Sequence, residues 1–311
     1  MSCYFAVIDL GSNSVRMSVN KVESDGKWLA IEKLRETVRL SEGMEKDGFL
    51  KETAMQRVIE ALKRFSGVAK QYRCVSIAAI ATAAVRTAAN KTLFLSRVKE
   101  ATGIDLKVIS GEEEAYYSYL ALKETLGVTN GVIFDTGGGS TEITLVKNGQ
   151  IVSSVSLPLG AVVLTERMAH SSQSQLYRYV AAHIGAIEWI DECCSLPVYA
   201  IGGSTRTLAM LCKKRMLTAQ ELDGLKLNYH QVAKMYQKIF NTPVNLRADM
   251  PGMDKARADI ILAGLTPAKV LMDMTGSPEM FVCNSGVKEG VFFRLKDEII
   301  KAHEVKKHNE L

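Results

Sequence analysis

The sequence lacks the signatures of several common functional classes. No Cys-x-x-Cys pair occurs and no histidine stands at zinc-ligand spacing, so a structural zinc site is not expected. There is no Gly-x-Ser-x-Gly elbow and no Gly-x-x-x-x-Gly-Lys loop, which leaves serine-nucleophile and P-loop chemistry without support. The longest nearly uncharged apolar stretch, residues 75–85, is too short to span a bilayer, so no membrane partner is expected.

Cysteine is sparse, and its placement indicates free thiols. The six cysteines include the neighbours Cys193 and Cys194, and a disulfide between adjacent residues would be strained. Reduced thiols are typical of a cytosolic protein. The N-terminus enters an apolar strand without the basic-then-apolar pattern of a secretory signal. The sequence therefore predicts a cytoplasmic protein.

The length and the charge set broad limits on architecture and ligand. A chain of 311 residues is long for one hydrophobic core, so two domains are expected, with a boundary between residues 126 and 127. The net charge of +5 suits a polyanionic substrate but does not require one. The basic clusters at 213–215 and 301–308 are interpreted as solvated surface, and no nucleic-acid partner is expected.

Two short glycine loops, each led by an aspartate at the end of an apolar strand, are the most informative feature. The first is Asp9-Leu10-Gly11-Ser12-Asn13-Ser14, and the second is Asp135-Thr136-Gly137-Gly138-Gly139-Ser140-Thr141-Glu142. Glycine lets the backbone turn sharply, so that its N–H groups approach a ligand closely. Each loop continues into a strand, a tight turn and a further strand. This repetition predicts two related half-domains that each bind phosphate.

The remaining pattern predicts alternating helices and strands. The expected strands and turns are 4–9, 15–22, the hairpin turn 24–26, 28–34, 77–81, 106–109, 132–135, 142–146, 151–157, 198–201 and 280–282. The expected helices are 51–71, about 90–101, one opening at Ser110, 173–192, 218–224, 229–240, 257–274 and one after 286.

Several side chains near these loops could carry chemistry. Asp135 and Glu142 flank the second loop and could hold magnesium together with phosphate oxygens, although Glu142 could also be an ordinary strand residue. In Ser110–Glu114, a structural role at the start of a helix explains Glu112 and Glu113, and Glu114 remains open as a base for water. Arg86 could bind a terminal phosphate or pair on the surface. The turn at 202–205 could hold phosphate or simply turn the chain.

Four motifs in order resemble the exopolyphosphatase and guanosine pentaphosphate phosphohydrolase (Ppx/GppA) family of the actin-like superfamily. They are 7–14, 81–86 with Asn90, 109–115 and 135–142. The resemblance implies an α/β fold of two actin-like (ASKHA, ribonuclease H-like) domains with the active site in an interdomain cleft. It covers nearly the whole chain. It also implies that a C-terminal helix, about 287–311, packs back on the first domain.

The resemblance assigns roles to individual positions. Glu114 takes the place of the catalytic base and Arg86 that of a second catalytic group, while Asp135 and Glu142 match the carboxylates associated with Mg²⁺. The implied phosphate-binding positions are Asp9, Gly11, Ser12, Asn13, Ser14, Gly137, Gly138, Gly139, Ser140, Gly203 and Ser204.

Two segments depart from the family pattern. Gly203-Ser204-Thr205 stands where a Gly-Thr pair is more common, and Lys288 replaces an arginine. Lysine keeps the charge but loses the planar fork, which puts a phosphate role for Lys288 in doubt. The chain also looks like the short, two-domain form, which favours shorter polyphosphates, and the resemblance is compatible with a homodimer.

The function expected from the sequence is release of terminal orthophosphate from inorganic polyphosphate by Mg²⁺-assisted attack of water. Guanosine pentaphosphate is the alternative substrate, because it also presents a terminal anhydride. A non-hydrolytic sensor of polyphosphate or an alarmone is a third reading, which the presence of Glu114, Asp135 and Glu142 disfavours. An actin-like ATP-dependent kinase is a fourth, disfavoured by the glutamate-led helix at Ser110.

Overall fold

The computed structural model describes residues 3–23 and 27–297. The expected hairpin turn at 24–26 and the basic tail at 301–308 lie outside these residues. The chain divides into two compact units, one formed by Met1–Ser110 with Val287–Leu311 and the other by Gly111–Gly286. Each unit has its own sheet and hydrophobic core.

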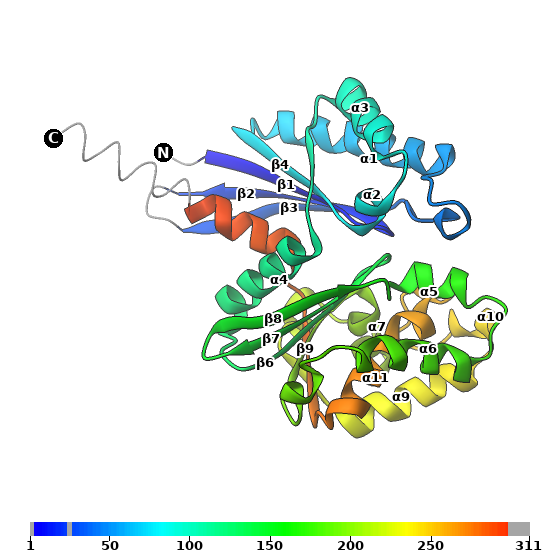
Figure 1. The fold of residues 1–311 in the computed structure, drawn as a ribbon. Helices are drawn as coiled ribbons and strands as arrows, with labels where there is room; N and C mark the ends of the chain where they lie inside the picture. The colour runs from blue at the N-terminus through cyan, green and yellow to red at the C-terminus, as the bar shows by residue number, and fades with distance from the viewer. Residues whose placement is uncertain (1–2, 24–26, 298–311) are drawn as a thin grey trace. The chain divides into compact units, whose positions relative to one another are not determined.

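The sheet of the first unit has five strands in the order β3-β2-β1-β4-β5 (Figure 1). β1 to β3 form an antiparallel meander, and β4 and β5 continue the sheet parallel to β1. The strands are β1 (Cys3–Leu10), β2 (Ser14–Val22), β3 (Trp28–Thr37), β4 (Ser76–Ala81) and β5 (Leu106–Val108). The first glycine loop therefore joins two central strands.

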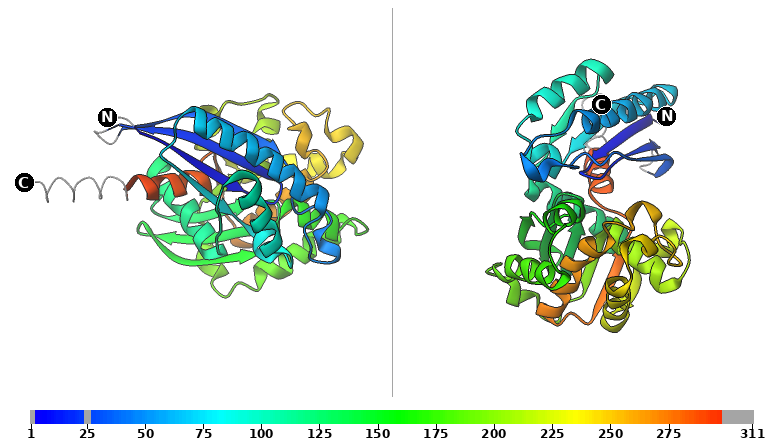
Figure 2. Two further views of the ribbon diagram at one scale, coloured as in Figure 1. Left: turned by 90° about the horizontal axis from the view of Figure 1, so that it is seen from above. Right: turned by 90° about the vertical axis from the view of Figure 1, so that its right-hand side faces the viewer.

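Helices cover the sheet of the first unit. The long helix α1 (Glu52–Gln71) runs across the sheet, as Figures 1 and 2 show, and contacts β2 and α3. Its apolar face, which includes Val58, Leu62 and Phe65, is buried at helical spacing. The other helical segments are η1 (Met44–Lys46), α2 (Ala83–Thr87), α3 (Lys91–Thr102) and residues 287–297.

The second unit repeats the strand order of the first. Its sheet runs β10-β11-β9-β6-β7-β8, in which β6 to β8 form an antiparallel meander and β9 lies parallel to β6. The strands are β6 (Gly131–Thr136), β7 (Thr141–Lys147), β8 (Gln150–Leu157), β9 (Val198–Gly202), β10 (Leu225–Asn228) and β11 (Glu279–Cys283). Because β6 precedes the second glycine loop as β1 precedes the first, the predicted α/β fold of two related units is confirmed.

The two faces of the second sheet are covered differently. Alternate residues of β6, such as Val132 and Phe134, enter the large core with helices α6, α7, α9 and α11, whereas Ile133 packs with α4. The helical elements are α4 (Gly111–Leu126), α5 (Ala161–Arg167), α6 (Gln173–Gly185), η2 (Ile190–Cys193), α7 (Gly203–Lys213), α8 (Ala219–Leu222), α9 (Tyr229–Asn241), α10 (Val244–Arg247), η3 (Lys255–Arg257) and α11 (Ile261–Thr275).

The structure refines several expectations from the sequence. The predicted helix 173–192 ends at Gly185, and η2 follows it; the predicted helix 257–274 begins at Ile261 after η3. The sequence pattern does not predict strand β10 or helices α2, α5, α7 and α10. Helix α4 groups with the second unit instead of ending the first, because it packs against β6, β7 and β8. Residues 287–297 group with the first unit, where the Trp28 ring contacts Phe292 in a tilted arrangement and Phe293 edge to face.

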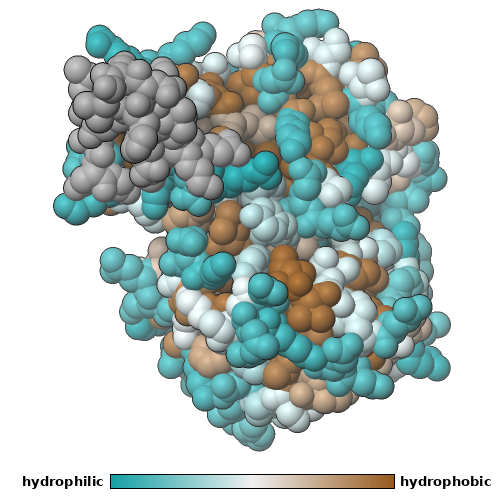
Figure 3. All heavy atoms as spheres, turned by 60° about the vertical axis from the view of Figure 1, so that its left-hand side comes forward, coloured by the Kyte–Doolittle hydropathy of each residue, from teal (hydrophilic) through white to brown (hydrophobic). Residues whose placement is uncertain are grey.

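Hydrophobic surface is scattered over the described residues. On the face shown in Figure 3, hydrophobic residues lie in small areas among hydrophilic ones. None of the described helices is long and apolar enough to cross a membrane. All six cysteines are free thiols, as the sequence predicts.

Candidate active site

In the second glycine loop the carbonyl groups accept hydrogen bonds within the protein, whereas two of the N–H groups donate to no backbone carbonyl of the described residues. Gly137 N–H donates to Ser140 O at 3.0 Å, which closes the turn. The carbonyl oxygens of Gly137 and Gly138 accept hydrogen bonds from the first N–H groups of α5 at 2.9–3.2 Å. Within the described chain, neither Gly138 nor Gly139 donates its N–H to a backbone carbonyl. Such a run of N–H groups is suited to an anion.

Gly160 is the residue on which this loop rests. A Cβ atom at Gly160 would lie 2.3 Å from Gly139 N and C and 2.4 Å from Gly138 C. These are backbone atoms, so no side-chain movement could make room. The loop and the start of α5 can therefore approach one another only with glycine at position 160.

Asp135 and Glu142 lie directly opposite one another on β6 and β7. Directly opposed residues of an antiparallel pair project from the same face, and their Cβ atoms are about 5 Å apart. Two carboxylates at such a distance repel by on the order of 3 kcal/mol near a protein surface. Both side chains are buried. A cation or hydrogen-bond donors must therefore offset this repulsion.

One serine hydroxyl contacts each carboxylate. Ser118 Oγ, on α4, donates to Asp135 Oδ2 at 2.8 Å, and Ser156 Oγ, opposite Glu142 on β8, donates to Glu142 Oε1 at 2.7 Å. A hydrogen bond to a charged group contributes about 1.5–3 kcal/mol. The two hydrogen bonds are thus strong enough to help hold both carboxylates in place. The carboxylates together give the α4 side of the sheet a region of negative charge.

Glu114 belongs to the same side of the second unit. It lies in the first turn of α4, one helical turn before Ser118, and its side chain is only 7% exposed. Since Ser118 reaches Asp135 near the end of β6, the same face of α4 also carries Glu114. Glu112 and Glu113, in the same turn, are more exposed.

The turn at 202–205 lies beside the second loop in the sheet. Gly202 is the register partner of Thr136, and a Cβ at Gly202 would be 2.5 Å from Thr136 O. A Cβ at Gly203 would overlap the guanidinium of Arg257, at 1.9–2.3 Å. The buried hydroxyls of Thr136 and Ser204 have no hydrogen-bond partner among the described residues. Buried hydroxyls without a protein partner are candidate contacts for a polar ligand.

The first glycine loop has the same backbone turn in the other unit. Gly11 N–H donates to Ser14 O at 3.1 Å, and the carbonyls of Ser12 and Asn13 accept from the segment 38–41 at 2.9–3.1 Å. Ser12 Oγ and Asn13 Nδ2 are buried and find no partner in the part of the chain that the structure describes. Asp9 lies in β1, one residue before the strand ends at this turn.

Arg86 lies in the first unit, in the short helix that follows β4. It lies in α2, and its Nη1 donates to Ile109 O at 3.1 Å. The side chain is half-buried. This bond to the loop after β5 fixes the guanidinium, so the fork is oriented before any ligand is present.

The residues present fit a hard divalent cation. Among the described residues there is no group of three or more His, Cys, Asp or Glu side chains that could hold a metal by themselves. Mg²⁺ is usually held by one or two carboxylates together with phosphate oxygens, and Asp135 and Glu142 supply that number. The donor set is all oxygen, as Mg²⁺ prefers.

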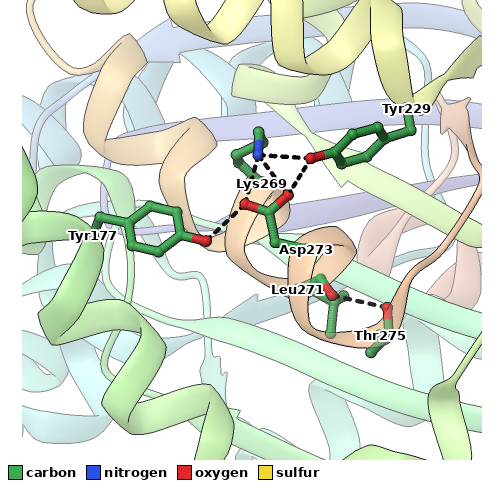
Figure 4. Close-up of polar contacts among 6 residues, drawn as sticks. All are labelled: Tyr177, Tyr229, Lys269, Leu271, Asp273 and Thr275. Atoms are coloured by element: carbon green, nitrogen blue, oxygen red, sulfur yellow. Dashed lines mark hydrogen bonds and ion pairs between the residues drawn. The ribbon is translucent and has the colours of Figure 1, made fainter.

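A second polar cluster in the same unit consists of side chains that bond to one another (Figure 4). Asp273 accepts from Tyr177 and Tyr229, each at 2.7 Å, and from Lys269 at 2.5 Å. Burial, and then the hydrogen bond to Asp273, raises the pKa of Tyr177. Burial lowers the pKa of Lys269, but its contacts with Asp273 and Tyr229 outweigh that effect and leave the pKa raised. Both carboxylate oxygens of Asp273 are used, so the cluster ties helices together.

The structure thus distributes the predicted site residues over two units. The second unit contains the predicted site residues from Glu114 to Ser204, and the first contains Arg86 and the loop from Asp9 to Ser14. Sequence reasoning did not single out Ser118, Gly160 or Arg257. Only Ser118 had a signal, its helical spacing from Glu114.

Comparison with known proteins identifies relatives over most of the chain. A model of the Ppx/GppA phosphatase family matches residues 19–298. Exopolyphosphatase 1 of Mycobacterium tuberculosis is 27% identical, over 94% of this chain and 88% of that protein. The bifunctional 3-dehydroquinate synthase/phosphatase of Fusobacterium nucleatum is 29% identical, over 89% of this chain but only 44% of that protein. Guanosine-5'-triphosphate,3'-diphosphate pyrophosphatase of Vibrio parahaemolyticus is 28% identical, over 95% and 60%.

A solved structure resembles the whole chain. The Ppx/GppA family member of Aquifex aeolicus superimposes with a TM-score of 0.80 at 27% sequence identity. The match covers 97% of this chain and 99% of that one. The likeness therefore includes both units.

Proposed function

This chain belongs to the Ppx/GppA phosphatase family, and from that premise we propose that it hydrolyses the terminal phosphoanhydride of inorganic polyphosphate. The observation that supports this most strongly is the grouping in the second unit. One helix face carries the buried Glu114 and the Ser118–Asp135 hydrogen bond, and Asp135 leads directly into the glycine loop. A base, a pair of carboxylates and a row of N–H groups are the parts that attack of water on phosphorus requires.

In the proposed reaction, Glu114 takes a proton from a water molecule as the water oxygen bonds to the terminal phosphorus. The bond from that phosphorus to the bridging oxygen breaks, and the shortened chain leaves with the bridging oxygen. The products are orthophosphate and a polyphosphate one unit shorter. The N–H groups of Gly138 and Gly139 stabilise the charge on the transferring phosphoryl group.

Asp135 and Glu142 are the residues that would hold Mg²⁺, which when bound supplies positive charge to the phosphate oxygens. The chain's own part is to keep these two carboxylates side by side through Ser118 and Ser156. In the first unit, the loop from Gly11 to Ser14 and the fixed guanidinium of Arg86 provide further donors for phosphate.

Polyphosphate is the first candidate substrate, and guanosine pentaphosphate is the second. Relatives of this chain carry both kinds of name, exopolyphosphatase 1 and guanosine-5'-triphosphate,3'-diphosphate pyrophosphatase. Both substrates present a terminal anhydride, so the loops do not separate them. Guanosine pentaphosphate remains the second candidate for the same chemistry.

The experiment is phosphate release by the purified chain with Mg²⁺, measured on polyphosphates of several lengths and on guanosine pentaphosphate in parallel. Glu114→Ala should lower kcat by about 10²- to 10⁴-fold, the usual contribution of a general base, and leave the binding of polyphosphate nearly unchanged. Glu112→Ala, in the same turn but exposed, is the matched control and should retain activity.

The outcomes separate the candidates. Release from guanosine pentaphosphate alone would favour the second substrate. Tight binding of either compound without any release would make the chain a sensor. If Glu114→Ala weakened binding as much as turnover, Glu114 would not be the base.

A further inference from the structure

Ser118 connects the helix that carries Glu114 to the strand that carries Asp135. Its hydroxyl, 1% exposed as a side chain, donates to Asp135 Oδ2 at 2.8 Å. Asp135 is the residue at which β6 enters the glycine loop, and Ser118 follows Glu114 by one helical turn. The Ser118 hydroxyl thus links the Asp135 carboxylate to the helix face that bears Glu114.

The packing of α4 does not depend on this hydroxyl. Tyr119 and Leu122 of α4 are buried in a cluster with Ile133, Val146 and Ile201 of the sheet. Burial of such side chains supplies most of the free energy that holds a helix on a sheet. Removal of the Ser118 hydroxyl should therefore leave α4 in place and change mainly the orientation of the Asp135 carboxylate.

The surroundings make that orientation consequential. Asp135 stands opposite Glu142, whose Oε1 accepts from Ser156, so each carboxylate of the pair has one serine donor from a different element. Loss of the Ser118 donor would remove one of the contacts that hold the Asp135 carboxylate beside the like charge of Glu142. A pair that has turned apart is a poorer chelate for a cation, because the two oxygens no longer converge.

We propose that Ser118 is a positioning residue that sets the affinity of the Asp135–Glu142 pair for a divalent cation. The proposal rests on the proposed function only in taking these two carboxylates as the cation ligands. Outer donors of this kind typically change metal affinity by about 10- to 100-fold when removed. Ser118 does not itself touch substrate in this proposal.

The test is the binding of Mn²⁺ to the full chain at a fixed, saturating concentration of inorganic phosphate, measured by titration calorimetry and by the electron paramagnetic resonance of free Mn²⁺. Mn²⁺ prefers the same oxygen ligands as Mg²⁺ and is directly visible. Ser118→Ala should weaken Mn²⁺ binding by about 10- to 100-fold. The matched control is Thr125→Ala on the same helix, because the Thr125 hydroxyl donates only to Ala121 O, at 2.8 Å, and its removal should leave Mn²⁺ affinity unchanged.

Thermal melting of each variant distinguishes positioning from structure. Should Ser118→Ala fail to fold, Ser118→Cys, which keeps the volume but donates weakly, takes its place in the same titration. Equal Mn²⁺ affinity in wild type and Ser118→Ala would overturn the proposal, whether or not the melting temperature changes. Absence of Mn²⁺ binding by the wild type would overturn it too.

The phosphate-release assay tests the proposed function independently. A wild type that binds Mn²⁺ more tightly than Ser118→Ala but releases no phosphate would retain the role of Ser118 and refute the hydrolase. Phosphate release with unaltered Mn²⁺ affinity in Ser118→Ala would do the reverse.

Discussion

The two glycine loops share a backbone and differ in the charges that face them. In each, the glycine after the strand donates to the serine three positions on, at 3.1 Å for Gly11 and 3.0 Å for Gly137. A Cβ at either glycine would be 3.4 or 3.5 Å from that same serine carbonyl. In both loops, carbonyl groups accept hydrogen bonds from a segment that follows in the chain. The repeat is therefore one of geometry as well as of sequence.

The residue opposite the leading aspartate marks the difference. Asp9 faces Arg16 across β1 and β2, whereas Asp135 faces Glu142 across β6 and β7. An opposite charge across an antiparallel pair is favourable, and a like charge is not. The Asp9–Arg16 pair therefore has no net charge, and the ionised Asp135–Glu142 pair has a net charge of −2. This contrast supports the proposal that the cation binds in the second unit and that the first unit contributes phosphate contacts.

The strongest way to break this comparison is to neutralise each aspartate in turn. Asp135→Asn should raise the Mg²⁺ concentration needed for half-maximal phosphate release by roughly 100-fold or more, since loss of a direct ligand exceeds the loss of an outer donor. Asp9→Asn should leave that concentration within about threefold, because Arg16 and not a cation faces Asp9. The measurement is a Mg²⁺ titration of both variants at saturating polyphosphate.

A variant that releases no phosphate gives no value for the Mg²⁺ requirement, so its cation affinity is measured by Mn²⁺ binding instead. If Asp9→Asn shifted the requirement for the cation as much as Asp135→Asn, the cation would not be specific to the second unit, and the charge argument would fail.

The glycine that packs beneath the second loop provides a second test, with a smaller expected effect. Gly160→Ala would place a Cβ 2.3 Å from the backbone of Gly139, so the second loop must move. We expect KM for polyphosphate to rise by about tenfold and stability to fall by ~1–3 kcal/mol, the usual cost of overpacking. Gly67→Ala is the control: Gly67 lies in α1 with open space around its Cβ position, and alanine there should stabilise the first unit by up to ~1 kcal/mol.

Steady-state kinetics and urea unfolding measure the two effects. An unchanged KM in Gly160→Ala would mean that the loop can shift without loss of phosphate contacts, and its rigidity would then be irrelevant to binding.

Local signals in the sequence predicted the repeated part of the fold. The Asp-x-Gly loops and the alternating strands around them are encoded within a few residues, and α1 shows its buried face at helical spacing. The unit to which α4 belongs was not predictable in this way. Tyr119 and Leu122 indicate a buried face but not which sheet covers it, and only long-range contacts decide that.

The site followed the same division. Glu114, Asp135 and the glycines stand in motifs, so their resemblance to a family was visible in the sequence. Gly160 and Arg257 act from distant positions on residues of those motifs, and nothing near them in the sequence marks the contact. Ser118 is intermediate, because its spacing from Glu114 was readable while its partner Asp135 was not.

A final contrast compares ion pairs in the two units. Lys269 and Asp273 are only 13% and 20% exposed, and two tyrosines share the carboxylate. Asp273→Asn should therefore leave a largely buried ammonium without its counter-charge and destabilise the second unit by ~2 kcal/mol, less than a fully buried pair would cost. In the first unit, the side chains of Lys99 and Asp105 are 60% and 80% exposed, so Asp105→Asn should change stability by less than ~0.5 kcal/mol.

The two tryptophans allow each unit to be followed separately in this test. Trp28 belongs to the first unit and Trp189 to the second, so a Trp28→Phe background reports the second unit by fluorescence and a Trp189→Phe background reports the first. Urea unfolding of Asp273→Asn should move the Trp189 transition and leave that of Trp28 in place. Equal shifts of both transitions would show that the units unfold as one cooperative body, and stability could then not be assigned to either unit alone.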